Sequence, residues 1–218
     1  SVFDIITNHL DLWGASLVGT LILFFGGALL ALVLGFLVGA MRVSPVPIAQ
    51  MVGAAYVNVI RNTPLTLVFF IFAFAVPVLF PIGQADYLTL GILALGIYTA
   101  TYVAEVLRSG INTVPVGQAE AARAIGLPFG QVMSLIVLPQ AARAVVPPMM
   151  SVLIALLKNT TVAAGFSVVN LGSIRANMSE RGEDALGVLL VVAAVFVALV
   201  LLLSWVQNAL ERHWKVAR

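Results

Sequence analysis

Long runs without any charged residue dominate this sequence. Between Asp11 and Arg42 lie thirty consecutive residues that include no Asp, Glu, Lys or Arg. A helix of this length spans about 45 Å, more than the roughly 30 Å hydrocarbon core of a bilayer. Charged residues make up only 9% of the chain, which is too few to cover a water-soluble globule. The sequence therefore predicts an integral membrane protein.

Charged and proline-containing segments divide the rest of the chain into further apolar runs. We expect an all-α membrane protein in which residues 1–218 form a single transmembrane domain. Its five transmembrane helices are expected at about 12–41, 47–80, 87–107, 134–157 and 186–206. The second is expected to be one element broken at residues 61–64, and the fourth to be bent by its prolines.

Small residues recur every fourth position along the first predicted span. They are Gly27, Ala31, Gly35 and Gly39. Such a ridge lets the backbone of a second helix approach closely, so we expect a packing contact here. The alternative is that membrane helices are simply rich in glycine.

Basic residues are distributed unevenly among the connecting segments. Seven of the eleven fall in one set of segments: Arg42, Arg108, Arg123, Arg143, Arg212, Lys215 and Arg218. The other set holds Asp4, Asp11, Asp86 and the 164–184 loop. Positively charged loops favour the cytoplasmic side, so we expect the N-terminus outside, and the C-terminus and residues 108–135 inside. Trp13 and Trp214 are expected in the aromatic belts near the two membrane surfaces.

A polar segment at 117–130 interrupts the apolar runs. Residues 118–125 are rich in helix formers, Gly126 suits a left-handed residue after a helix, and Pro128 suits the start of a new one. We therefore expect a helix, a glycine turn and a second helix. A helix this short is marginal alone in water and needs a partner surface. The alternative is that Glu120 and Arg123 simply pair with each other.

This segment resembles the EAA motif of the membrane subunits of ATP-binding-cassette (ABC) importers. The residues that match are Glu120, Ala121, Ala122, Gly126, Ile136, Leu138 and Pro139. In that family the helix of the motif is a coupling helix that docks on the ATPase subunit. The resemblance thus implies ATPase-coupling roles for Glu120, Ala121, Ala122, Arg123 and Gly126.

Four other segments resemble the polar amino-acid uptake subfamily of these importers. They are RNTPL (61–65), YVAEVLRSGINTVPVGQAEAARAIGL (102–127), LPQAARAVVPPM (138–149) and LLKNTT (156–161). The resemblance covers about residues 15–210 and implies a type I importer permease fold in the cell membrane. It also implies a second permease, identical or homologous, two ATPases that bind ATP and Mg²⁺, and an extracytoplasmic solute-binding protein.

Polar and ionisable residues at membrane depth are costly and so are candidates for the solute pathway. Two clusters qualify: Arg61, Asn62 and Thr63, and Lys158, Asn159, Thr160 and Thr161. We expect them to flank a pocket, with Pro64 freeing a backbone carbonyl nearby. Alternatively, Lys158 extends to the interface and Arg61 caps a kink. Two further pairs are expected to be mainly structural: Tyr98 with Tyr102, which alternatively line the pore, and Glu105 with Arg108.

Two departures from the subfamily pattern bear on the solute. Lys158 is followed by Asn159 where an acid is usual, and Val169-Asn170-Leu171 replaces an apolar-Glu-Leu triplet. Both changes remove negative charge, which favours glutamate or glutamine over arginine or lysine. A permease for another polar amino acid, such as histidine or arginine, is the alternative.

Other functional classes find little support in the sequence. A phosphate-binding G-x-x-x-x-G-K-[ST] loop is absent, so ATP hydrolysis is expected in a separate subunit and no cofactor on this chain. The only histidines are His9 and His213, and no H-E-x-x-H or G-x-S-x-G motif occurs, which argues against an enzyme or a metal site. No basic cluster with aromatic residues suggests nucleic-acid binding. A passive channel or secondary carrier would not need an EAA helix.

Overall fold

The computed structural model describes residues 2–80 and 86–213, and within these ranges every regular element is a helix. The α-helices are α1 (Val2–Thr7), α2 (Leu10–Val43), α3 (Pro47–Arg61), α4 (Leu65–Phe70), α5 (Val76–Leu79), α6 (Tyr87–Asn112), α7 (Val116–Ala124), α8 (Phe129–Val132), α9 (Leu138–Asn159), α10 (Ile174–Glu180) and α11 (Ala185–His213). Two π-helical turns, η1 (Ile71–Ala75) and η2 (Met133–Val137), and a 3₁₀ helix, η3 (Thr160–Phe166), join some of them. The predicted all-α class is confirmed.

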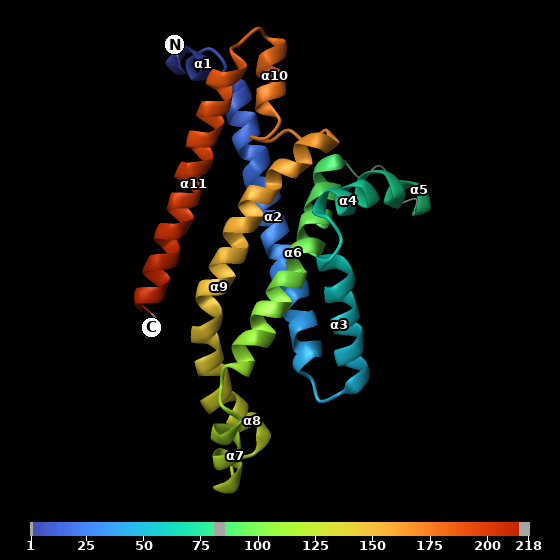
Figure 1. The fold of residues 1–218 in the computed structure, drawn as a ribbon, viewed down its shortest axis with the longest axis vertical. Helices are drawn as coiled ribbons and strands as arrows, with labels where there is room; N and C mark the ends of the chain where they lie inside the picture. Colours follow the sequence, from blue (N-terminus) through green and yellow to red (C-terminus); the bar gives the residue numbers. More distant parts are fainter. Residues whose placement is uncertain (1, 81–85, 214–218) are drawn as a thin grey trace.

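Four stretches are long and apolar enough to cross a membrane: Leu10–Val43, Tyr87–Asn112, Phe129–Phe166 and Ala185–Arg212. They correspond to the first, third, fourth and fifth predicted spans. The fourth is longer than the predicted 134–157, because α8, η2, α9 and η3 follow one another without a break (Figure 1). Its prolines Pro147 and Pro148 lie inside α9 without ending it.

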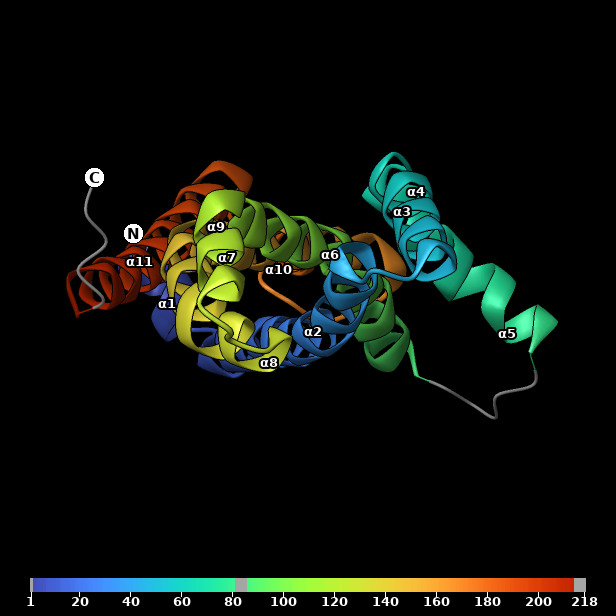
Figure 2. The same ribbon diagram turned by 90° about the horizontal axis from the view of Figure 1, so that it is seen from below.

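The second predicted span, 47–80, is two helical segments at an angle of 100°. α3 packs beside α2 and α6, whereas α5 projects away from the other helices (Figure 2). The break falls at Asn62–Pro64, as expected. In a continuous helix the N–H of residue 64 would donate to the Ile60 carbonyl, but proline has no N–H. That carbonyl instead accepts a hydrogen bond from Thr63 N–H at 3.1 Å. The expectation that Pro64 frees a carbonyl is therefore wrong.

The predicted small-residue ridge on α2 packs against α6. A Cβ atom on Gly27 would lie 3.3 Å from the Cβ of Leu95, and one on Gly35 would lie 2.4 Å from the Cβ of Val103. Further along, a Cβ on Gly39 would meet the side chain of Leu107 at 3.1 Å. The two backbones therefore approach more closely than larger residues would allow, which confirms the packing prediction.

The N-terminal end of α2 is held by contacts with α1, α10 and α11. Trp13 is only 8% exposed and donates from Nε1 to the Ile5 carbonyl at 3.1 Å. The expectation that Trp13 lies in a membrane-surface belt is therefore wrong, because its ring packs in a core with Ile174 and Val188. Trp214, the counterpart expected at the other surface, lies outside the described residues.

The two sets of charged segments lie at opposite ends of the molecule. α1 and α10 gather at one end, and α7 and α8 lie at the other (Figure 1). At the first end, His9 Nε2 contacts Glu183 Oε1 at 3.0 Å. Asp86 caps α6 by accepting a hydrogen bond from Thr89 N–H at 2.8 Å, and this bonding to Thr89 lowers the pKa of the Asp86 carboxyl. Lys215 and Arg218 of the basic set lie outside the described residues.

Replacing Gly35 tests the contact between α2 and α6. The new Cβ of Gly35→Ala would also lie 3.0 Å from the backbone oxygen of Ala100, so the helices must separate. We expect a loss of about 1–3 kcal/mol, measured as a lower midpoint of thermal unfolding in detergent. Gly14→Ala is the matched control in the same helix, since a Cβ there meets nothing within 4 Å. Equal thermal midpoints for the two variants would contradict close packing of α2 against α6.

Candidate functional site

The segment between α7 and α8 forms an elbow, as the sequence predicted. Gly126 has a φ of 91°, in the left-handed region. Its N–H donates to the Arg123 carbonyl at 3.0 Å, and the Leu127 N–H donates to the Ala122 carbonyl at 3.1 Å. This pair of bonds is a Schellman motif, which satisfies the last carbonyls of α7 and fixes the direction of the chain. The next helix begins at Phe129, directly after Pro128.

The motif residues of α7 divide into an outer and an inner face. Glu120, Ala121 and Arg123 are exposed, whereas Ala122 is only 4% exposed. Glu120 and Arg123 form no ion pair in the described structure, and Arg123 Nε donates instead to the Ala119 carbonyl at 3.4 Å. The alternative that these two residues simply pair is therefore not supported.

Ala122 attaches the elbow to the start of α9. It packs in a small apolar core with Val132, Val137 and Ala141. Alongside this core, Gln140 Nε2 donates to Gln118 Oε1 at 2.6 Å. A larger side chain at position 122 would push α7 away from α9, so Ala122 positions the elbow rather than presenting a surface.

Exposed apolar side chains surround the polar outer face of the elbow. Val116 is 69% exposed, Ile125 81% and Phe129 70%. Sequence reasoning missed them because in a chain this apolar an isolated Ile or Phe carries no signal. On a segment that also carries the exposed Glu120 and Arg123, such exposed apolar side chains are typical of a surface that contacts a protein partner.

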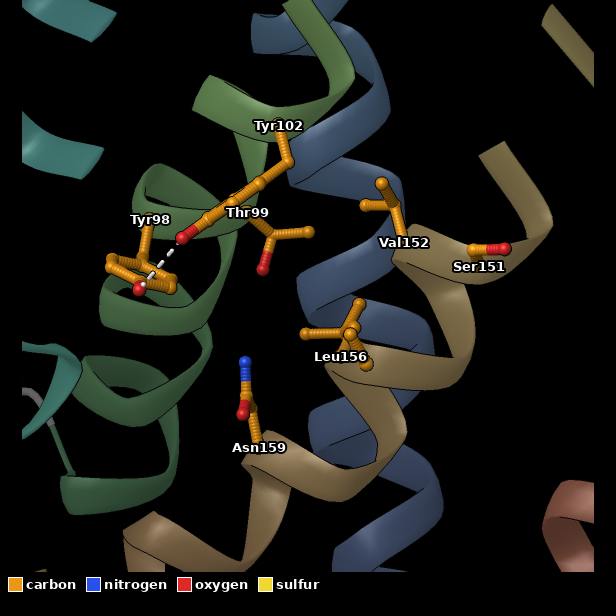
Figure 3. Close-up of a pocket in the computed structure, with 8 residues that line it drawn as sticks. Tyr98, Thr99, Tyr102, Ser151, Val152, Leu156 and Asn159 are labelled. Atoms are coloured by element: carbon orange, nitrogen blue, oxygen red, sulfur yellow. Dashed lines mark hydrogen bonds between the residues drawn. The ribbon is translucent and has the colours of Figure 1, made fainter. Parts of the chain in front are cut away.

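A cavity of about 420 Å³ lies between α6 and α9 (Figure 3). It is lined by Tyr98, Thr99, Tyr102, Ser151, Val152, Ala155, Leu156 and Asn159. The hydroxyl groups of Tyr98 and Tyr102 are hydrogen bonded to each other at 3.0 Å. The lining thus combines uncharged polar groups with apolar side chains, and the two tyrosines, expected mainly to pack, form part of it.

Thr99 is a lining residue whose hydroxyl is buried without a hydrogen-bond partner in the described part of the chain. Its side chain is buried, with 3% of the residue exposed, and its Oγ1 makes no hydrogen bond within the described structure. In Figure 3 this hydroxyl points into the cavity, and Asn159 points towards it from α9. A buried hydroxyl without a partner is costly, so a polar ligand would satisfy it. Sequence analysis did not single out Thr99.

The two predicted polar clusters do not surround one cavity. Of the cluster on α9 and η3, Asn159 alone lines the cavity between α6 and α9. Lys158 and Thr161 line a separate groove against α11, and Thr160 is fully buried, donating to the Leu157 carbonyl at 2.6 Å.

The cluster at the end of α3 is also absent from the lining of that cavity. Arg61 is the last residue of α3, Asn62 is its C-cap, and Thr63 Oγ1 donates to the Val59 carbonyl at 2.8 Å. This placement matches the alternative that Arg61 lies at a kink.

The presence of Asn170 in place of a glutamate gives no information about the charge of the solute. It is fully buried, and its Oδ1 accepts a hydrogen bond from Gly172 N–H at 2.6 Å while its Nδ2 donates to the Val168 carbonyl at 3.1 Å. The side chain thus closes a turn in its own loop. The argument from missing negative charge therefore depends on Asn159 alone.

A group of three charged residues joins α2 to α6 on the elbow side of the cavity. The Glu105 carboxylate accepts a hydrogen bond from Arg108 Nη2 at 2.5 Å, and its other oxygen pairs with Arg42 Nη1. The predicted pair of Glu105 with Arg108 is confirmed, and Arg42 is the partner that sequence spacing did not indicate. Over residues 2–80 and 86–213, no group of three or more His, Asp or Glu residues could hold a metal ion.

Comparison with known proteins identifies the relatives of this chain. The family described as "Binding-protein-dependent transport system inner membrane component" matches residues 11–216. The glutamate transport system permease protein GluC of Corynebacterium glutamicum is 43% identical over 76% of this chain and 76% of that protein. The probable glutamine ABC transporter permease protein GlnM of Bacillus subtilis is 34% identical over 97% of this chain and 95% of that protein.

Solved structures share the fold. A crystal structure of an amino acid ABC transporter with histidines superposes with a TM-score of 0.88 at 25% identity, covering 95% of this chain and 96% of that chain. An inward-facing MetNI methionine ABC transporter gives a TM-score of 0.81 at 23% identity, covering 97% and 99%. The predicted type I importer permease fold is confirmed.

Gly126→Ala tests whether the elbow depends on the left-handed residue. The space around Gly126 is open, so the substitution adds backbone strain of roughly 1–2 kcal/mol without a steric clash. We expect faster amide hydrogen exchange over residues 116–132. Gly130→Ala is the control, because its surroundings are equally open and its φ is not positive. Unchanged exchange in Gly126→Ala would refute the role of the Schellman turn.

Proposed function

We propose that glutamate or glutamine is the solute carried by this chain. The chain belongs to the family of binding-protein-dependent transport system inner membrane components. It is a permease subunit of an ABC amino-acid importer. Two relatives with at least 34% identity are named for these two solutes. A multi-pass membrane location follows from the family and from the apolar helices. Histidine and arginine are less favoured, and a passive channel does not fit the family.

The cavity between α6 and α9 is the proposed contact site for the solute. The observation that carries this is the Thr99 hydroxyl, which points towards the cavity, has almost no accessible surface and makes no hydrogen bond within residues 2–80 and 86–213. The amide of Asn159 and the hydroxyl groups of Thr99, Tyr98 and Tyr102 supply donors for a carboxylate, and the hydroxyl oxygens supply acceptors for an ammonium group. The lining has no fixed charge to repel either end of a zwitterion.

The outer face of the elbow is the proposed contact with an ATPase subunit. Glu120 and Arg123 supply charges, and the exposed side chains of Val116, Ile125 and Phe129 supply apolar surface that docking would bury. With this contact we propose that the elbow and the C-terminus lie in the cytoplasm and the N-terminus outside. ATP and Mg²⁺ are then bound by two ATPase subunits, and a second permease and an extracytoplasmic solute-binding protein complete the importer.

Transport requires that the elbow and the cavity move together. Both contact the continuous stretch Phe129–Phe166: α7 packs on its first turns, and Asn159 near its other end lines the cavity. We infer that closure of the ATPases displaces α7 and α8, and that α9 carries this displacement to the cavity, opening it to one side of the membrane at a time.

Thr99→Val tests the solute site. The change removes the unpaired hydroxyl at nearly constant volume, so the thermal midpoint should stay the same or rise. Affinity for the solute should fall by roughly 5- to 30-fold, the equivalent of about 1–2 kcal/mol. The measurement is binding of radiolabelled glutamate and glutamine to the purified transporter.

Thr101→Val is the matched control for the solute site. Thr101 is fully buried in the same helix but donates to the Tyr98 carbonyl at 2.7 Å, so this variant should lose stability and keep its affinity. Unchanged affinity in Thr99→Val would remove the cavity from the solute pathway.

Glu120→Lys tests the coupling surface. Reversing an exposed charge at the ATPase contact should lower uptake and solute-stimulated ATP hydrolysis at least about tenfold, with normal amounts of the chain in the membrane. Glu180→Lys at the opposite end of the molecule is the control. Equal activity of the two variants would exclude Glu120 from the contact, and the ATPase subunit should co-purify less with Glu120→Lys alone.

A further inference from the structure

A pair of glutamines joins the elbow to the long helix that borders the cavity. Gln140 Nε2 donates to Gln118 Oε1 at 2.6 Å, which links α9 to α7. Within residues 2–80 and 86–213, no other hydrogen bond or ion pair connects a side chain of α7 to a different element. Neither glutamine is among the motif residues that indicated a coupling role. The pair is therefore the one directional side-chain contact between α7 and the rest of the described chain.

The side chain of Gln140 is held in place by a second hydrogen bond. Its Nε2 also donates to the Ile136 carbonyl at 2.9 Å, so both amide hydrogens have an acceptor. Ile136 lies in η2, the π-helical turn that directly precedes α9. The amide of Gln140 thus connects α7 both to the first turn of α9 and to the turn from which α9 begins.

Gln118 lies on the side of α7 that faces α9. Successive residues of a helix are rotated by about 100°, so Gln118 and Ala122 are only about 40° apart around the axis. By the same rule Glu120 lies about 160° from Gln118, and Arg123 about 140°. The exposed charges and the glutamine therefore occupy opposite sides of α7. A displacement applied to the outer face reaches α9 through Gln118 and through the small core around Ala122.

These two contacts constrain α7 in different ways. The core that Ala122 shares with Val132, Val137 and Ala141 is apolar, and apolar contact has no preferred direction. It holds α7 against α9 without fixing how the two helices are rotated relative to each other. A hydrogen bond, in contrast, weakens steeply when its angle departs from the optimum. The bond between Gln118 and Gln140 therefore opposes the rotation and sliding that the apolar core permits.

We propose that Gln118 and Gln140 are positioning residues for transport. Their hydrogen bond keeps α7 in register with α9, so that a displacement of α7 moves the start of α9 and is not lost by slippage between the two helices. The cavity lies farther along α9, where Ser151 and Asn159 line it. Without the bond, ATP hydrolysis continues while less solute is moved per ATP. This inference rests on the proposed function, because it requires the outer face of the elbow to contact an ATPase.

Removing either glutamine tests the link in the otherwise intact transporter. Gln118→Leu and Gln140→Leu should each lower the solute taken up per ATP hydrolysed by about three- to tenfold, the change in coupling that one hydrogen bond supports. Uptake of radiolabelled glutamate and glutamine and hydrolysis of ATP are measured in the same proteoliposomes. The ATPase subunit should co-purify normally, and the thermal midpoint should stay near that of the wild type. A wild-type ratio of uptake to hydrolysis in both variants would overturn the proposal.

Three further variants separate a positioning link from a purely structural role. Gln118→Glu keeps an acceptor for Gln140 Nε2 and should keep the wild-type ratio. The double variant Gln118→Leu with Gln140→Leu should lose no more than either single variant, because all three lack the same bond. Gln207→Leu is the control, since it removes a hydrogen bond of 2.9 Å to Glu211 Oε1 within α11 and should leave the ratio unchanged. Losses that add in the double variant, or a fall in Gln118→Glu as large as in Gln118→Leu, would refute the link.

Amide hydrogen exchange in the assembled transporter tests the link without reference to the solute. ATP should change the exchange of α7 in both wild type and Gln140→Leu, but that of residues 140–146 in the wild type alone. An equal change over 140–146 in both proteins would show that the link is wrong, while the proposed function stands. If ATP changes the exchange of neither α7 nor α9 in the wild type, the elbow is not the ATPase contact, and the proposed coupling fails together with the link.

Discussion

The close contact between α2 and α6 is the interaction on which the other helices depend. Lipid is as apolar as the helices themselves, so helices associate in a membrane through close van der Waals packing rather than through the hydrophobic effect. Gly27, Gly35 and Gly39 allow that packing on α2. On the resulting pair rests α3, whose Tyr56 hydroxyl donates to the Ile97 carbonyl of α6 at 2.6 Å, while α9 packs on the other side of α6. One wall of the cavity between α6 and α9 is therefore part of this closely packed pair.

The other wall of the cavity belongs to α9, which connects the cavity to the elbow. At one end it supports the elbow, and beyond its other end Phe166 stacks on Phe69 with ring centroids 5.1 Å apart. Pro147 and Pro148 lie between the elbow and the cavity, and each removes a backbone hydrogen bond from the helix. A helix bends most easily where such bonds are missing. The two walls of the cavity thus come from helices of different character: closely packed α6 and proline-containing α9.

Local signals in the sequence predicted much of the site, and packing decided the rest. Gly126 and Pro128 indicated the elbow because their backbone preferences act within a few residues. The opposite exposure of Ala121 and Ala122 was not predictable, since it depends on how α7 rests on α9. Asn159 and Lys158 are neighbours in sequence but line different cavities, because successive residues point about 100° apart around a helix.

By itself, the sequence determined the membrane class, the approximate positions of the apolar spans, the small-residue ridge and the helix–turn–helix elbow. Each depends on composition or on backbone preferences that extend over a few residues, so each can be inferred from a short segment of the sequence. The tertiary structure alone decided that Thr99, Tyr102 and Asn159 share a cavity, that Arg42 joins Glu105, and that Lys158 lines a separate groove against α11. These arrangements depend on the relative rotation and crossing of helices far apart in the chain, and no single segment encodes them.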